Sequence, residues 1–93
     1  MELYFNGNFN IVIRHMFKED EITVGSKWVS VGTKIPVEVI KVEDGWIEYR
    51  YFDGKIHEKD VFCFQCRYCL VVEDLEAFSI KYVGQFEVVD TLD

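Results

Sequence analysis

Hydrophobic and polar residues alternate most regularly in the middle of the chain, in runs divided by Asp-Gly pairs. The runs span 36–43, 46–52 and 55–58, with Asp44-Gly45 and Asp53-Gly54 between them. Alternation is typical of strands with one buried face, and Asp-Gly favours tight hairpin turns because glycine tolerates a positive φ. The sequence therefore predicts two consecutive hairpins.

The second run predicts which side chains face the core and which face away. Alternation places Ile47, Tyr49 and Tyr51 on one face, and Trp46, Glu48, Arg50 and Phe52 on the other. The first run loses its alternation near Ile40, which predicts a bulge and strong bending. Short, bent, consecutive hairpins favour a small closed barrel.

The flanking segments predict further strands. Residues 24–32 are expected to form a strand, and 3–5 and 9–14 a hairpin around Asn6-Gly7-Asn8. Residues 18–21 are interpreted as a solvated connection. In the tail, Asp74 is a candidate cap for a helical turn through Phe78, followed by a strand over 80–89 that is interrupted at Gly84. A helix over 75–83 is the alternative.

Length and charge limit the classes of function. The 93 residues, 49% of them hydrophobic, fit one domain. The net charge of −7 is concentrated outside the middle: residues 1–22 carry −2, residues 23–72 are neutral and residues 73–93 carry −5. Acidic protein is repelled by phosphate backbones, so nucleic-acid binding is disfavoured. Two explanations of the negative charge remain: it keeps the chain soluble, or it allows the chain to bind a basic protein surface.

The location expected from these features is cytoplasmic. The chain starts without a basic, apolar leader, and no apolar run has the length of a membrane span. Three cysteines, an odd number, argue against a secreted disulfide framework.

The three cysteines, Cys63, Cys66 and Cys69, lie three residues apart among aromatic residues. Zinc binding needs three or four ligands that converge, which neither a strand nor a helix provides at this spacing. A redox pair needs a setting that favours the thiolate, and Asp60 disfavours one. We therefore favour packing of the cysteines in the core. A short helix that begins at Asp60 would align Phe64 with Tyr68, and residues 70–72 would form the last strand.

The order of these features resembles small SH3-like barrels found in bacteria and their phages. The resemblance covers residues 24–73 and uses core and turn positions, namely Trp28, Val37, Val39, Val42, Gly45, Ile47, Tyr49, Arg50, Gly54, Phe64, Tyr68 and Val71. It implies a mostly β fold: a barrel of about five strands with a helical turn near 60–67. Residues 1–22 would add an N-terminal hairpin and residues 74–93 an acidic C-terminal extension within one domain, 1–93. It implies a phage or mobile-element accessory protein, and no activity.

Catalytic residues are not evident. His15 and His57 are best explained as surface or strand-face residues, and no serine has the surroundings of a nucleophile. We expect no enzyme, cofactor, metal or membrane contact.

A protein-binding module fits better. Trp46, Arg50 and Phe52 are exposed anchors unless the terminal extensions cover them. The candidate interaction residues are these three together with the acidic residues Glu73, Asp74 and Glu76.

Three hypotheses about function follow. The first is an accessory protein that modulates a host protein through acidic ends and exposed aromatic residues. The second is a self-associating adaptor, for example a homodimer joined through edge strands. The third is a zinc or redox protein.

Overall fold

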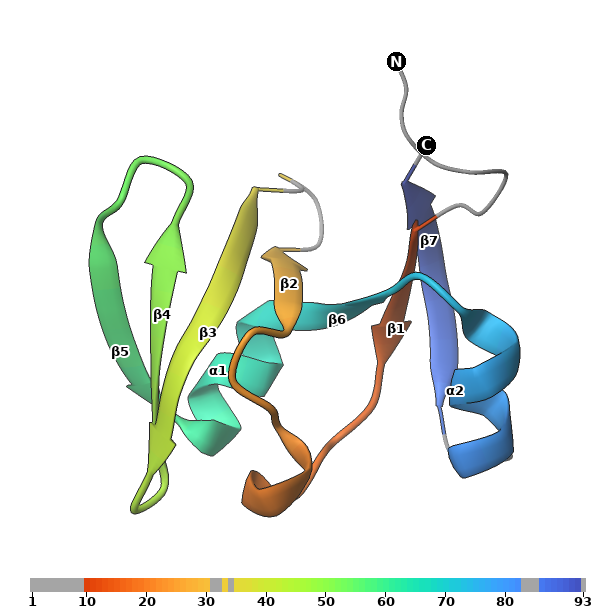
Figure 1. The fold of residues 1–93 in the computed structure, drawn as a ribbon, viewed down its shortest axis with the longest axis horizontal. Helices are drawn as coiled ribbons and strands as arrows, with labels where there is room; N and C mark the ends of the chain where they lie inside the picture. The colour runs from red at the N-terminus through yellow and green to blue at the C-terminus, as the bar shows by residue number, and fades with distance from the viewer. Residues whose placement is uncertain (1–9, 31–32, 34, 83–85, 93) are drawn as a thin grey trace.

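The computed structural model describes residues 10–30, 33, 35–82 and 86–92. The predicted first strand of the N-terminal hairpin, 3–5, and its turn lie outside the described residues. In chain order the elements are β1 (Asn10–Arg14), the 3-10 helix η1 (Glu19–Glu21), β2 (Lys27–Ser30), β3 (Pro36–Glu43), β4 (Trp46–Tyr51), β5 (Ile56–Asp60), α1 (Val61–Arg67), β6 (Tyr68–Val72), α2 (Leu75–Lys81) and β7 (Glu87–Leu92) (Figure 1).

The strands form one open antiparallel sheet in the order β5-β4-β3-β2-β6-β1-β7. Strands β2 to β5 follow one another as a meander. Helix α1 then carries the chain back, so that β6 pairs with β2 on one side and β1 on the other. The predicted mostly β class is confirmed.

The Asp-Gly pairs form the predicted turns. Asp44 and Gly45 both have positive φ, 53° and 81°, which matches the right-handed twist of the β3–β4 hairpin. Gly54, at φ 91°, closes the β4–β5 turn, and its N–H donates to the Tyr51 carbonyl. The register of β3 on β4 shifts between Val39 and Lys41, so the bulge predicted near Ile40 is confirmed.

Helix α1 forms where the sequence predicted a helical turn. The Asp60 carboxylate accepts a hydrogen bond from the Cys63 N–H at 2.8 Å, which satisfies one backbone donor of the first turn. Phe64 and Tyr68 stack with their ring centroids 5.0 Å apart, and Phe64 meets Trp28 edge-on at 5.0 Å. The helix therefore lies against the sheet through its aromatic side.

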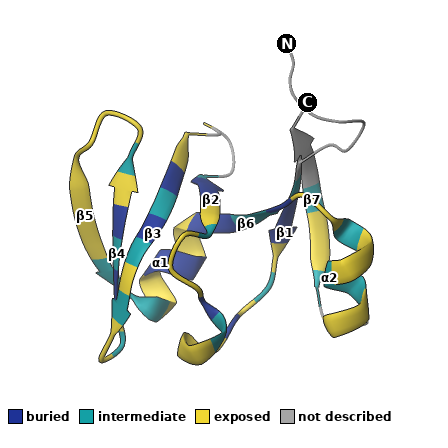
Figure 2. Ribbon diagram, in the orientation of Figure 1, coloured by how far each residue is buried: buried dark blue, intermediate teal, exposed yellow. Residues whose placement is uncertain are grey.

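The main core lies between the sheet and helix α1. We call the side of the sheet that faces α1 the inner face. Figure 2 shows the buried positions along β2, β3, β4 and α1. The buried members are Phe17, Ile22, Trp28, Val37, Val39, Ile47, Tyr49, Phe64, Tyr68 and Tyr82. A smaller core of Val12, Val29 and Cys69 lies on the other face, over β1, β2 and β6.

Gln65 links α1 to the segment that precedes η1. Its amide oxygen accepts from the Phe17 N–H at 2.6 Å, and its amide nitrogen donates to the Phe17 carbonyl at 2.8 Å. Gln65 is buried, so both of these bonds are shielded from water. One side chain thus fixes a segment that lies 48 residues earlier.

The preference for a strand over 80–89 was wrong at its start, and the helical alternative is correct there. Asp74 caps α2 by accepting from the Ala77 N–H at 3.1 Å, as predicted. Phe78 and Tyr82 are four residues apart, and their rings meet at 4.7 Å and pack on Phe17. This aromatic pair requires a helix, which outweighs the β preference of Ile80.

Candidate protein-interaction face

The side chains of β4 alternate between the core and solvent. Ile47 and Tyr49 are buried, whereas Trp46 is 50% exposed, and Phe52, in the turn that follows β4, is 82% exposed. We call the side of β3, β4 and β5 that carries Trp46, Glu48, Arg50 and Phe52 the outer face. Within the part of the chain that the structure describes, both aromatic residues are therefore accessible.

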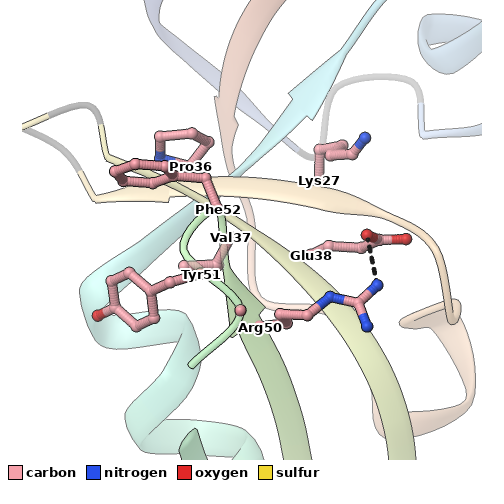
Figure 3. Close-up of a pocket in the computed structure, with 8 residues that line it drawn as sticks. Lys27, Pro36, Val37, Glu38, Arg50, Tyr51 and Phe52 are labelled. Atoms are coloured by element: carbon pink, nitrogen blue, oxygen red, sulfur yellow. Dashed lines mark hydrogen bonds and ion pairs between the residues drawn. The ribbon is translucent and has the colours of Figure 1, made fainter. Parts of the chain in front are cut away.

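An open hollow of about 520 Å³ adjoins Phe52. Figure 3 shows Phe52 and Pro36 on one side of it, and Lys27, Glu38 and Arg50 on the other. The Arg50 guanidinium lies 3.2 Å from the Glu38 carboxylate, so the ion pair holds its plane next to the hollow. The hollow thus offers an apolar wall and a charged wall.

The charged wall is a cross-strand row. Lys27 on β2 lies opposite Glu38 on β3, which lies opposite Arg50 on β4. Opposed residues of an antiparallel pair share one face, so their charges meet across the strands. Two cations and one carboxylate give this end of the outer face a local positive excess within a chain of net charge −7.

A second, more polar hollow of about 210 Å³ adjoins Trp46 at the other end of β4. Its lining residues are Lys41, Glu43, Asp44, Trp46, Glu48 and Glu58. Lys41 Nζ lies 3.1 Å from Glu43 and 3.9 Å from Glu48, and the hydrogen bond with Glu43 raises the pKa of Lys41. Glu48 faces Glu58 directly across β4 and β5. Four carboxylates and one ammonium give this end a negative excess.

Trp46 and Phe52 therefore belong to two hollows rather than one patch. Trp46 begins β4 and Phe52 follows its last residue. The two are six residues apart, which corresponds to about 20 Å of strand. A partner that contacts both must extend along the outer face.

The acidic residues Glu73, Asp74 and Glu76 lie elsewhere. They fall between β6 and α2 and within its first turn, and β2 and β3 separate β6 from β4 in the sheet (Figure 1). The Asp74 carboxylate is committed to the N-terminus of α2. The structure thus does not bring these acids together with Trp46, Arg50 and Phe52.

The interpretation of all three cysteines as core residues was wrong for two of them. Cys69 is buried, and its burial raises the pKa of its thiol. Cys63 and Cys66 are exposed because Phe64 and Gln65 occupy the core-facing side of α1. A hydrogen bond with the Asp60 carboxylate raises the pKa of the Cys63 thiol.

Two tyrosines join β4 to β6 below the outer face. The hydroxyls of Tyr51 and Tyr68 lie 2.8 Å apart, and burial together with this bond raises the pKa of Tyr68 well above its usual range. His57 on β5 is exposed and stacks on Tyr49 at 6.0 Å. These contacts give Tyr68 and His57 structural roles.

Gln65 is a buried polar residue that the sequence did not indicate as important. Its position next to Phe64 on a short amphipathic helix is the only signal in the sequence, and that signal does not name Phe17 as its partner.

Comparison with protein-family models, curated proteins and solved structures finds no match for this chain. Among the residues that the structure describes, no group of three or more His, Cys, Asp and Glu side chains is placed to hold a metal ion. No helix in that part of the chain has the length and apolar character to cross a membrane.

Proposed function

We propose that this chain is a non-enzymatic protein-binding module whose binding surface is the outer face of β3–β5. The observation that carries the proposal is the exposure of Phe52, 82%, at the rim of a hollow of about 520 Å³ beside Arg50. Aromatic residues and arginine are the most common anchors of protein interfaces. Lone exposed apolar residues are ordinary, but an aromatic ring, a hollow and an oriented guanidinium together form a binding anchor.

A comparison within the sheet supports the proposal. Over β1, β2 and β6 the side opposite the main core buries Val12, Val29 and Cys69. Over β3–β5 the corresponding side stays open to solvent. The apolar side chains Phe52 and Ile56 on that side are exposed in the described part of the chain, which leaves them available to a partner.

The charges indicate what kind of partner fits. The Phe52 hollow carries Lys27 and Arg50, and the Trp46 hollow carries four carboxylates. A complementary protein segment has a carboxylate and an apolar side chain at one end, and a basic side chain about 20 Å away at the other.

The resemblance of residues 24–73 to small SH3-like barrels of bacteria and phages supports a cellular role. Strand β6, the last strand of that region, pairs with β2, its first, so the five strands follow the order β5-β4-β3-β2-β6. We therefore propose an accessory protein of phage or mobile-element type that binds and modulates a host protein in the cytoplasm.

The test is affinity capture from bacterial lysate at low and high salt, read by mass spectrometry. Three baits are compared: wild type, Phe52→Ser and the matched control Phe62→Ser, which alters a ring that is 64% exposed on α1. We expect one host protein on wild type and Phe62→Ser, lost on Phe52→Ser. High salt weakens the charge contacts at both hollows, so retention should fall as ionic strength rises.

Two outcomes contradict the proposal. Equal capture by Phe52→Ser and wild type would exclude this hollow as the anchor. Capture of the chain's own untagged copies alone, in place of a host protein, would favour the self-associating adaptor.

Edge pairing is the route to that adaptor, and β5 is an edge strand. Lys59 lies opposite the buried Ile47, so it brings a charge to the core-facing side of this edge. An inward charge on an edge strand disfavours edge-to-edge pairing. The structure of β5 thus argues for a different surface, and we favour the outer face.

A further inference from the structure

Cys63 and Cys66 form a pair on the solvent side of α1. Residues three apart on a helix are neighbours on its surface, with Cβ atoms about 5–6 Å apart. Both thiols are exposed, and charge on Cys66 is among the influences on Cys63. Cys69 lies apart from the pair because it is buried with Val12 and Val29.

The spacing of the pair decides between two kinds of thiol chemistry. A disulfide needs Cβ atoms about 3.5–4.5 Å apart, which is closer than two helical neighbours stand. The helix resists this approach because Asp60 caps it, Phe64 lies in the core and Gln65 bonds to Phe17. Two sulfurs that share one ion lie up to about 4.6 Å apart if each metal–sulfur bond has the length of a zinc–thiolate bond, about 2.3 Å. Cβ atoms about 5–6 Å apart allow that separation in the intact helix, because each sulfur can rotate about its own Cα–Cβ bond.

We propose that Cys63 and Cys66 bind one soft monovalent cation, of which copper(I) is the cellular example, between their two sulfurs. Thiolates are soft ligands that select such ions. The ion displaces the proton of each thiol, including the Cys63 proton that the Asp60 carboxylate favours, so one cation replaces two protons and no electron is transferred. Zinc requires three or four ligands, and no group of three or more His, Cys, Asp and Glu side chains among the described residues is placed to hold it. The proposal does not depend on the proposed protein partner.

Silver(I) is the probe, because it has the charge and softness of copper(I) and is stable in air. One equivalent is added to the reduced chain, and native mass spectrometry counts ions and protons. We expect one silver ion per chain, with two protons lost. Loss of a supporting residue costs a metal site 10–100-fold in affinity, so Cys63→Ser and Cys66→Ser should each weaken binding at least about 100-fold. Cys69→Ser should bind as wild type does.

Three results would overturn the proposal. One is undiminished binding by both single variants. Another is loss of binding in Cys69→Ser while its far-ultraviolet circular dichroism matches wild type. The third is an ion found only in a complex of two chains, each giving one sulfur.

A second measurement stands without any variant. A low-molecular-weight disulfide should oxidise the Cys63–Cys66 pair slowly in the native chain and faster in urea, where α1 no longer holds the sulfurs apart. Each oxidation consumes one molecule of that disulfide and releases two of its thiol. Rapid formation of the internal disulfide under native conditions would contradict the spacing argument and identify a redox pair.

Discussion

One face of β4 is buried and the other is exposed to solvent, although the residues of the two faces alternate along one strand. Ile47 is fully buried, and its neighbour Trp46 is half exposed. The inner side is covered because α1 brings Phe64 onto Trp28 and Tyr49. On the outer side of β3–β5, by contrast, Trp46, Phe52 and Ile56 are exposed. Side chains along a strand alternate between the two faces. Within the six residues of β4, one set of alternate side chains can therefore stabilise the fold while the other set remains available to a partner.

Substitutions on the two faces should therefore separate into two classes. Inner-face changes should alter the free energy of unfolding. Outer-face changes should alter binding and leave the free energy of unfolding nearly unchanged.

The largest effect is expected from Ile47→Ala. Truncating a fully buried aliphatic side chain loses its transfer free energy and leaves a cavity, so the free energy of unfolding should fall by about 2–5 kcal/mol. Urea denaturation followed by tryptophan fluorescence measures the change. Glu48→Ala, the next residue on the outer face, is the control, with an expected change within about 0.5 kcal/mol. Similar losses in the two variants would contradict the assignment of faces.

The next effect tests whether the inner face depends on its polar link. Gln65→Leu keeps most of the side-chain volume and leaves the Phe17 N–H and carbonyl without their partner. A buried backbone group left unpaired costs about 1–3 kcal/mol, so the free energy of unfolding should fall by at least that amount. Arg67→Leu, an exposed change on the same helix, is the control in the same urea experiment. A neutral Gln65→Leu would show that water replaces the amide.

The sequence predicted much of the inner face for a clear physical reason. Alternation in 46–51 and the Asp-Gly turns are local signals, and they place Ile47 and Tyr49 correctly. Asp60 and Asp74 were likewise predicted as caps, because a cap is read from a few neighbouring residues.

Other features depend on contacts between distant residues, and the sequence did not reveal them. Gln65 pairs with Phe17, and the helical form of α2 depends on Phe78 and Tyr82 reaching Phe17. For the candidate site, the sequence proposed Trp46, Arg50 and Phe52 as anchors. The sequence could not show that the two rings border separate hollows. The lining of each hollow depends on which residues of neighbouring strands lie opposite each other, and this pairing is known only from the folded sheet.

A moderate effect that depends on pH is expected from Tyr68→Phe. Loss of its hydrogen bond with Tyr51 should cost about 0.5–1.5 kcal/mol at neutral pH. The folded pKa of Tyr68 lies above the usual value of 10.0, so the folded state favours the neutral phenol. The stability that this gives is complete below pH 10.0 and is lost as the pH rises towards the folded pKa.

Urea denaturation between pH 8 and 11 measures this effect. Wild type should lose stability more steeply than Tyr68→Phe above about pH 10, and the two curves should approach each other. Parallel curves over that range would mean that Tyr68 titrates alike in the folded and unfolded chains.

The smallest effect on stability, and the sharpest test of the comparison, is Phe52→Ser. The ring is 82% exposed, so little apolar area returns to water when it is removed, and unfolding should change by less than about 0.5 kcal/mol. The same variant should lose the captured host protein. A fall of 2 kcal/mol or more would show that Phe52 supports the fold, since a stability loss of that size belongs to buried side chains. Unchanged stability together with lost capture would place recognition on the outer face at Phe52, the residue that directly follows β4.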